Sequence, residues 1–225
     1  QQSFDLGTMM NRKDDVIKKL TGGVSGLLKG NKIETINGTG KIISKHQVEV
    51  TQSEDTIVLD AKNIILATGS KPIELPFARW SKNIVSSTGA LNFTEVPKKL
   101  GIIGAGIIGL ELGSVWSRLG SEVVILEALD EFLPSADYQI AKEVQKEFTN
   151  QGLNINLGCK VQDTIDSKDS VLVKFVRDGE DHELDFDKLI VAVGRTPNSQ
   201  NIFDSSVEIS IDSKGFVDVD QYCRL

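Results

Sequence analysis

Residues 100–109 read Leu-Gly-Ile-Ile-Gly-Ala-Gly-Ile-Ile-Gly, and this short stretch decides the fold. Its first four residues are apolar or glycine and predict a buried strand. The last six follow the pattern Gly-x-Gly-x-x-Gly and open a helix predicted over residues 107–119. A glycine-rich turn between a buried strand and a helix is typical of dinucleotide binding.

Each glycine of this turn has its own physical reason. Gly104 permits the tight turn, Gly106 lets the backbone approach a pyrophosphate, and Gly109 removes a side chain where helix and strand touch. Free N–H groups at the positive end of the helix attract the anion. The candidate coenzyme-binding residues of the turn are therefore Gly104, Ala105, Gly106, Ile107, Ile108 and Gly109. The competing interpretation is a strand-to-helix turn that binds nothing.

Downstream of the turn, strands and helices alternate. A buried strand is predicted at 122–126, a helix at 136–150 and a third strand at 153–157, which together indicate a doubly wound parallel sheet. Shorter strands follow at 161–165, 171–176 and 184–186, with Asp178-Gly179 as a turn, and a buried strand at 189–193.

Upstream of the turn, an amphipathic helix is predicted over residues 9–28, with Gly30 able to end it. Gly22, Gly23 and Gly26 predict either a break or a close approach to another group. The apolar stripe is interpreted as core-facing, with a partner-binding helix as the alternative.

Between the helix and the parallel sheet, short strands are predicted. They lie at 32–36, 40–43, 47–51 and 56–59, the last two joined as a hairpin, and form a small antiparallel unit. The continuous apolar run at 63–67 is predicted as a strand, and residues 71–96 are interpreted as a linker with short embedded elements.

The acidic residue expected after the next strand is present. Glu127 ends the strand at 122–126, where a carboxylate accepts hydrogen bonds from a ribose. It would repel an adenosine 2′-phosphate, and residues 128–135 contain no basic side chain, so NAD is predicted over NADP. Glu111, in the helix after the turn, is either a solvated glutamate favoured by the helix dipole or a residue near the nicotinamide.

Composition excludes several function classes. The net charge is −7, from 25 basic and 32 acidic residues, which is the wrong sign for a nucleic-acid partner. No apolar run is long enough for a membrane span, and residues 1–10 lack a secretory signal, so a cytoplasmic location is expected. Cys159 and Cys223 are far apart and are predicted to be reduced thiols, with no metal site.

Several short motifs carry a resemblance to a known family. They are Leu20-Thr21-Gly22-Gly23-Val24, Gly38-Thr39-Gly40, Ile64-Ile65-Leu66-Ala67-Thr68-Gly69-Ser70, the run from Gly104 to Glu111, Glu127-Ala128-Leu129-Asp130, and Ala192-Val193-Gly194-Arg195-Thr196-Pro197-Asn198. Through them the chain resembles the flavin-dependent pyridine nucleotide-disulfide oxidoreductases, and within that family the dihydrolipoamide dehydrogenases.

The resemblance implies an α/β fold. It consists of a Rossmann-like NAD-binding domain of three layers, a parallel sheet plus a small antiparallel sheet, with a partial FAD-binding domain. The implied limits are 1–93 for the partial FAD domain, 94–201 for the NAD domain, and 202–225 for the start of a return segment to the FAD domain.

The resemblance also implies roles for individual residues. Gly104, Gly106, Gly109 and Glu127 would hold NAD, Val161 would pack near its adenine, and Gly194 would lie beside the nicotinamide. Glu111 would lie near flavin and nicotinamide in a supporting catalytic role. The residues implied to line FAD are Gly40, Thr68, Gly69 and Ser70.

The implied chemistry moves electrons from dihydrolipoamide through a redox disulfide and FAD to NAD. A lipoyl dithiol substrate, a homodimer and 2-oxoacid dehydrogenase complexes are the implied partners. The family's flavin-binding Gly-x-Gly-x-x-Gly and Cys-x-x-x-x-Cys are expected before Gln1, and its His-Glu pair after Leu225. The chain is therefore expected to bind NAD weakly and not to turn over dihydrolipoamide.

Other interpretations remain open. One is a sister flavoprotein such as a mercuric reductase or a transhydrogenase; a glutathione-type reductase is disfavoured by Glu127. Another is a non-catalytic NAD-binding module, whose apolar surfaces would all be covered. A fragment of the oxidoreductase would instead expose apolar area on the helix at 9–28 and on the strand at 63–67.

Overall fold

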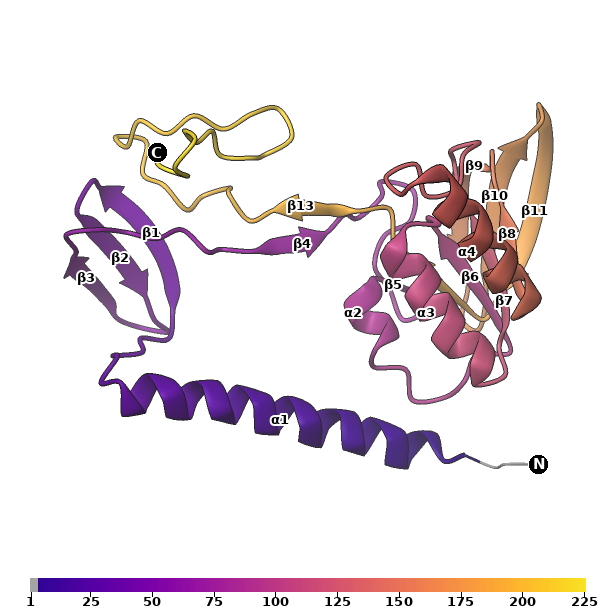
Figure 1. The fold of residues 1–225 in the computed structure, drawn as a ribbon, viewed down its shortest axis with the longest axis horizontal. Coiled ribbons are helices and arrows are strands. Elements are labelled where there is room, and N and C mark those ends of the chain that lie inside the picture. The colour runs from indigo at the N-terminus through magenta and orange to yellow at the C-terminus, as the bar shows by residue number, and fades with distance from the viewer. Residues whose placement is uncertain (1–3) are drawn as a thin grey trace. The chain divides into compact units, whose positions relative to one another are not determined.

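The computed structural model describes residues 4–225, which fold into two compact units (Figure 1). The first unit comprises residues 4–10 and 72–194, and the second comprises residues 11–71 and 195–225. Each unit is described by itself. The domain limits expected from the sequence, 1–93, 94–201 and 202–225, remain predictions.

A five-stranded parallel sheet is the centre of the first unit. Its strands lie in the order β5 (Ile84–Val85), β12 (Lys188–Val191), β6 (Lys99–Ile103), β7 (Glu122–Leu126) and β8 (Leu153–Asn156). Ile102 of β6 lies opposite Ile125 of β7 and Ile190 of β12. The buried strands predicted after residue 99 are confirmed, with limits within two residues of those expected.

Helices cover one face of this sheet. They are α2 (Ser87–Ala90), α3 (Ile107–Arg118) and α4 (Tyr138–Asn150). Leu100 and Ile102 of β6 share a buried cluster with Leu112 and Trp116 of α3. The helix predicted from residue 136 begins at Tyr138, because the Asp137 side chain accepts a hydrogen bond from the N–H of Gln139 and caps the helix there.

A three-stranded antiparallel sheet covers the other face. Its order is β11 (Glu180–Phe186), β10 (Val171–Arg177) and β9 (Lys160–Asp166). Val171 and Val173 are buried in a second cluster with Ile103 and Leu126 of the parallel sheet. Helices, parallel sheet and antiparallel sheet make three layers, which confirms the predicted fold class.

The second unit contains another small sheet. Strands β1 (Thr39–Ser44), β2 (Gln47–Thr51) and β3 (Thr56–Asp60) pair antiparallel in that order, as predicted. The N–H of Gln52 donates to the carbonyl of Asp55 at 2.8 Å and closes the predicted hairpin. Strands β4 (Ser70–Pro72) and β13 (Arg195–Pro197) form a separate pair.

Helix α1 (Leu6–Gly30) is longer than predicted and has no buried residue. The predicted break is wrong, because the helix runs continuously through its glycines. The alternative, a close approach, is also wrong within the described part of the chain. A Cβ built at Gly22, Gly23 or Gly26 would meet nothing within 4 Å.

Three further predictions need correction. Residues 32–36 and 63–67 are not strands, and Ile65 is 91% exposed. An apolar run becomes a strand only where another strand pairs with it, and neither segment pairs with any described residue. The region 71–96 is more than a linker, because Ile84, Ala90 and Phe93 are buried in the cores of the first unit.

Even α1, the longest helix within residues 4–225, lacks the apolar length that crossing a membrane requires, and so do the other helices described.

Candidate functional site

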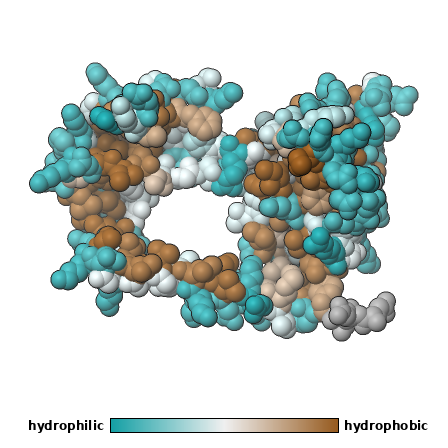
Figure 2. All heavy atoms as spheres, in the orientation of Figure 1, coloured by the Kyte–Doolittle hydropathy of each residue, from teal (hydrophilic) through white to brown (hydrophobic). Residues whose placement is uncertain are grey.

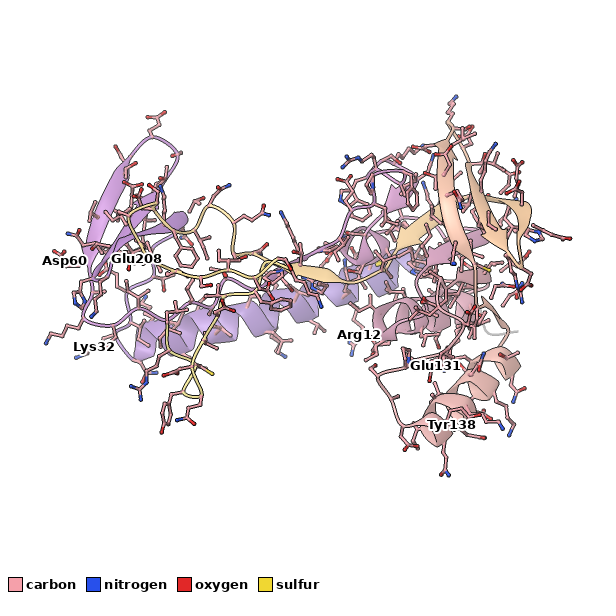
Figure 3. The ribbon with its side chains drawn as sticks, turned by 90° about the horizontal axis from the view of Figure 1, so that it is seen from above. Arg12, Lys32, Asp60, Glu131, Tyr138 and Glu208 are labelled. Atoms are coloured by element: carbon pink, nitrogen blue, oxygen red, sulfur yellow. The ribbon has the colours of Figure 1, made fainter. Side chains whose placement is uncertain are left out.

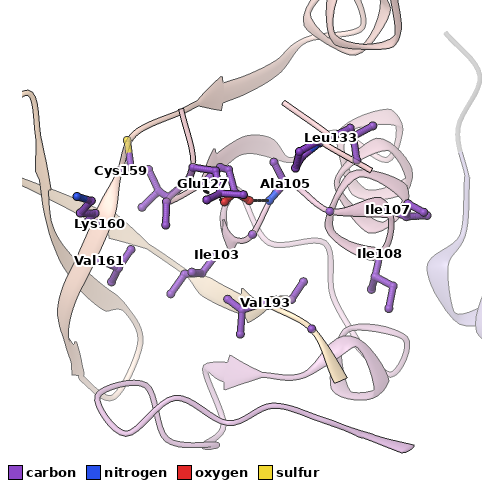
Figure 4. Close-up of a pocket in the computed structure, with 18 of the residues that line it drawn as sticks. Ile103, Ala105, Ile107, Ile108, Glu127, Leu133, Cys159, Lys160, Val161 and Val193 are labelled. Atoms are coloured by element: carbon purple, nitrogen blue, oxygen red, sulfur yellow. Dashed lines mark hydrogen bonds between the residues drawn. The ribbon is translucent and has the colours of Figure 1, made fainter. Parts of the chain in front are cut away.

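A pocket of about 800 Å³ opens at the carboxyl ends of the parallel strands in the first unit (Figure 4). Its walls come from the glycine turn (residues 104–109) after β6, the segment 127–135 after β7, the start of β9, and residues 192–194 after β12. Ligands of open α/β sheets bind at this end of the strands.

The three glycines of the turn have different surroundings. Gly104 has φ +104°, and a Cβ there would lie 2.6 Å from the carbonyl oxygen of Ala192. A Cβ at Gly109 would collide with the carbonyl oxygen of Gly104. At Gly106 a Cβ would meet nothing within 4 Å. Two glycines therefore serve backbone packing, while the third leaves space beside the turn.

Helix α3 begins at the pocket without a side-chain cap. Gly106 is its N-cap residue and supplies no side-chain hydrogen bond to the first turn. Ile107 and Ile108 of that turn line the pocket. The first N–H groups of an α-helix lack partners within the helix, so this end of α3 can bind an anion.

Glu127 places a carboxylate in the pocket wall. Its Oε2 accepts a hydrogen bond from the N–H of Ala105 at 2.7 Å, drawn as a dashed line in Figure 4. Its Oε1 accepts one from the N–H of Leu129 at 2.9 Å. The carboxylate therefore joins the segment after β7 to the glycine turn.

Most of the predicted coenzyme-binding residues line this one pocket. They are Gly104, Ala105, Gly106, Ile107, Ile108, Glu127, Val161 and Gly194. Gly109 lies behind the turn and supports it. Glu111 is exposed on α3 and does not line the pocket.

Three lining residues with titratable side chains were missed from the sequence. Lys160 precedes Val161 on β9 (Figure 4), and Glu131, labelled in Figure 3, lies between β7 and α4. Cys159 is a buried thiol whose pKa is raised by burial. Lys160 lies outside the stretch searched for basic residues, because β9 reaches the pocket only through tertiary packing. With Glu127 and Glu131 present, carboxylates still outnumber ammonium groups among the lining side chains.

The predicted FAD-lining residues all lie in the second unit. Gly40 is in β1, Thr68 and Gly69 precede β4, and Ser70 is its first residue. All four residues are exposed. Gly69 adopts φ +69°, and its carbonyl accepts from the N–H of Asn198 at 3.0 Å. Arg195 donates from Nε to the Ser70 hydroxyl at 2.8 Å. The 68–70 turn is thus held by residues 195–198.

Among residues 4–225, no three His, Cys, Asp or Glu side chains gather to hold a metal ion. Both cysteines are free thiols, Cys159 buried and Cys223 exposed. His46 contacts the carbonyl of Ala61 through Nδ1, and the His182 ring stacks on Phe175.

Curated relatives match nearly the whole chain. It is 46% identical over 225 residues to a dihydrolipoyl dehydrogenase of Cupriavidus necator, covering 97% of this chain and 47% of the relative. It is 38% identical to a dihydrolipoyl dehydrogenase of Geobacillus stearothermophilus, covering 99% of this chain and 47% of the relative. The chain therefore spans about half the length of these relatives.

Solved structures share the fold. The HOCl-induced flavoprotein disulfide reductase of Escherichia coli, solved as a Cu(II) complex, matches with TM-score 0.85 and 30% identity, over 94% of this chain and 48% of that one. LpdA of Mycobacterium tuberculosis matches with TM-score 0.89 and 21% identity, over 97% and 49% of the two chains, which supports the fold alone.

The family model described as pyridine nucleotide-disulphide oxidoreductase matches residues 2–225. That description names a pyridine nucleotide, and the E. coli relative is named for a flavin, the two cofactor classes predicted from the sequence. With the three-layer fold and the glycine turn in place, the chain belongs to the pyridine nucleotide-disulphide oxidoreductase family.

Proposed function

We propose that the pocket of the first unit binds NAD(H) and that the chain is the nucleotide-binding part of a dihydrolipoyl dehydrogenase. Relatives with that name at 46% and 38% identity support the assignment. The observation that carries it is the open space at Gly106, where a Cβ would meet nothing within 4 Å. It lies beside uncapped N–H groups of α3, the environment that a diphosphate requires.

The charges of the pocket favour NAD over NADP. Glu127 can accept hydrogen bonds from ribose hydroxyls and repels a 2′-phosphate. Glu131 adds a second negative charge, and Lys160 supplies one positive charge on the β9 wall. Two carboxylates against one ammonium disfavour an extra phosphate dianion.

The nicotinamide, when bound, supplies hydride transfer, and the protein supplies binding and orientation. The glycine turn would hold the diphosphate, Glu127 the ribose, Val161 the adenine, and Gly194 the nicotinamide end. Glu111 is proposed as a supporting residue near flavin and nicotinamide, a role compatible with its exposure on α3. Gly40 and the turn Thr68-Gly69-Ser70 are proposed contacts of FAD.

The whole enzyme's activity belongs to the same proposal. A lipoyl dithiol would be the substrate, a homodimer the assembly, 2-oxoacid dehydrogenase complexes the partners, and the cytoplasm the location. The 225 residues contain no vicinal cysteine pair, since Cys159 is buried and Cys223 lies 64 positions later. We therefore expect this chain by itself to bind NAD(H) without oxidising dihydrolipoamide.

A second candidate is another flavin-dependent disulfide reductase. The 30% identity and TM-score of 0.85 to the E. coli flavoprotein favour it. A non-catalytic module is disfavoured, because such a module would cover its apolar surfaces. Leu20 and Leu27 of α1 are 67% and 68% exposed.

Isothermal titration of the 225-residue chain with NADH and NADPH tests the coenzyme assignment. We expect one molecule of NADH per chain and weaker binding of NADPH. The absence of heat with both coenzymes, or tighter binding of NADPH, would contradict the proposal.

A further inference from the structure

Glu127 is fixed before any coenzyme arrives. Its N–H donates to the carbonyl of Asn156 at 2.9 Å, and its carbonyl accepts from the N–H of Cys159 at 2.8 Å. These bonds tie the residue to the end of β8 and to the segment between β8 and β9. The carboxylate therefore extends from a rigid support.

The glycine turn reaches this support through two hydrogen bonds. The N–H of Gly104 donates to the carbonyl of Leu126 at 2.8 Å, and the N–H of Ala105 donates to Oε2 of Glu127 at 2.7 Å. Ala105 is only 2% exposed, so its N–H lies in a region where an unpaired donor is costly. The Glu127 carboxylate supplies the acceptor that the turn itself lacks.

We propose that Glu127 is a positioning residue for the glycine turn, holding the Ala105 amide so that the turn is formed for the diphosphate before the coenzyme binds. This inference rests on the proposed function and deepens it, because it gives Glu127 a task besides accepting ribose hydroxyls. One carboxylate can do both, since its two oxygens offer about four lone-pair sites and the two amides occupy two of them.

Glutamine at position 127 would break this arrangement while preserving shape. The N–H groups of Ala105 and Leu129 donate to different oxygens of the carboxylate, and a carboxamide keeps an acceptor oxygen at only one of these two positions, so in this geometry one of the two N–H groups loses its acceptor. Its NH₂ group would then face the other backbone N–H, and because both groups are donors, no hydrogen bond could form between them. Removal of the negative charge would by itself strengthen anion binding, so a loss of affinity for a diphosphate would report on the turn.

The test compares ADP with 2′,3′-dideoxy-ADP, which keeps the adenine and diphosphate and lacks the ribose hydroxyls. In the unsubstituted 225-residue chain, ADP should bind more tightly by isothermal titration. In Glu127→Gln this difference should disappear, and dideoxy-ADP should also bind about tenfold more weakly than to the unsubstituted chain. Dideoxy-ADP affinity that is unchanged or improved would overturn the positioning role.

Glu131→Gln is the matched control. It removes a carboxylate that lines the same pocket, and because a negative charge repels the diphosphate, its removal should strengthen dideoxy-ADP binding slightly, the opposite direction to Glu127→Gln. A loss equal to that of Glu127→Gln would overturn the inference. Glu127→Asp keeps the charge but has a side chain one methylene shorter, so it should also weaken dideoxy-ADP binding. It replaces the glutamine variant in the test if that variant does not fold.

Amide hydrogen exchange gives a readout without ligand. Exchange at Ala105 should accelerate in Glu127→Ala, which removes both acceptor oxygens, while the amides of β7 stay protected, and equal protection of Ala105 in this variant and the unsubstituted chain would overturn the role. The two proposals fail differently. Absence of NADH binding by the unsubstituted chain overturns the proposed function. A dideoxy-ADP affinity that is the same in Glu127→Gln as in the unsubstituted chain overturns only the positioning role.

Discussion

Gly106 and Gly109 belong to the same turn, yet a methyl group added to each meets different surroundings. At Gly106 it enters open space, and at Gly109 it collides with the carbonyl oxygen of Gly104. Gly106→Ala should therefore leave the free energy of unfolding within about 1 kcal/mol of the original, because only the N-cap preference changes. It should weaken NADH binding at least tenfold by obstructing the diphosphate.

Gly109→Ala is the contrasting variant. Overpacking against backbone should cost about 1–3 kcal/mol or more, measured by urea unfolding. The account would be contradicted if Gly106→Ala unfolded as easily as Gly109→Ala, or if it bound NADH with unchanged affinity.

Asp204 carries a pH-dependent contact in the second unit. The N–H of Ser206 and the ammonium of Lys41, 3.0 Å away, lower the pKa of this carboxyl to about 2. A lowered pKa means that the ionised form stabilises the fold above the ordinary pKa, and that this contribution disappears as the pH falls through about 2. Lys41→Met should therefore raise the pKa of Asp204, as followed by NMR titration.

The raised value should stay below the ordinary one, because the hydrogen bonds from Ser206 remain. The control is Lys45→Met, which removes an exposed charge directly after β1, the strand that contains Lys41. It should leave the titration of Asp204 unchanged. An unchanged pKa in Lys41→Met would show that the ion pair has no influence on the carboxyl.

At the scale of elements, helix α1 presents an apolar face without cover. Val16, Ile17, Leu20, Val24 and Leu27 are all exposed, and Figure 2 shows brown apolar surface along the helix. A dye that fluoresces on apolar surfaces should bind the chain, and Leu20→Gln with Val24→Gln should reduce its fluorescence severalfold. Lys19→Gln is the matched control. Equal fluorescence of the double variant and the control would contradict this account of α1.

The parallel strands and their helices could be predicted from local patterns. Residues 123–126 are a continuous apolar run, residues 100–103 are apolar apart from Gly101, and Asp137 is a good N-cap, so local preference and tertiary structure agree. Strand β11 is predicted from the sequence only at 184–186, because residues 180–183 are all charged or polar. Pairing with β10 in full register makes them a strand against their own preference.

The opposite error occurred at residues 63–67. Their apolar run has strand preference but no paired partner among the described residues, and Ile65 faces open surroundings. For the pocket, the glycine turn and Glu127 were predictable from spacing. Lys160 and Glu131 were not, because no local rule states which later strand or loop closes a pocket wall.

At the scale of the whole molecule, the two sets of proposed cofactor contacts lie in different compact units. The NAD candidates are within residues 72–194, and the FAD candidates are within residues 11–71. Hydride transfer between the two cofactors would need both sets, and electron transfer from a lipoyl dithiol to the flavin would in addition need a redox dithiol. The two cysteines of this chain, both free thiols and one of them buried, do not supply that dithiol.

Purified chain should therefore show no NADH production from dihydrolipoamide and NAD, with or without added FAD, in an absorbance assay. A full-length dihydrolipoyl dehydrogenase serves as the positive control. Turnover by the 225-residue chain would contradict the account and require another electron acceptor within it.

The central claim is that the glycine turn and Glu127 hold a pyridine dinucleotide. A crystal structure of the chain with NADH tests it most directly. The account predicts the diphosphate against Gly106 and the first turn of α3, with a ribose hydroxyl bonded to Glu127. A pocket left empty at saturating NADH, or coenzyme bound away from residues 104–109, would contradict it.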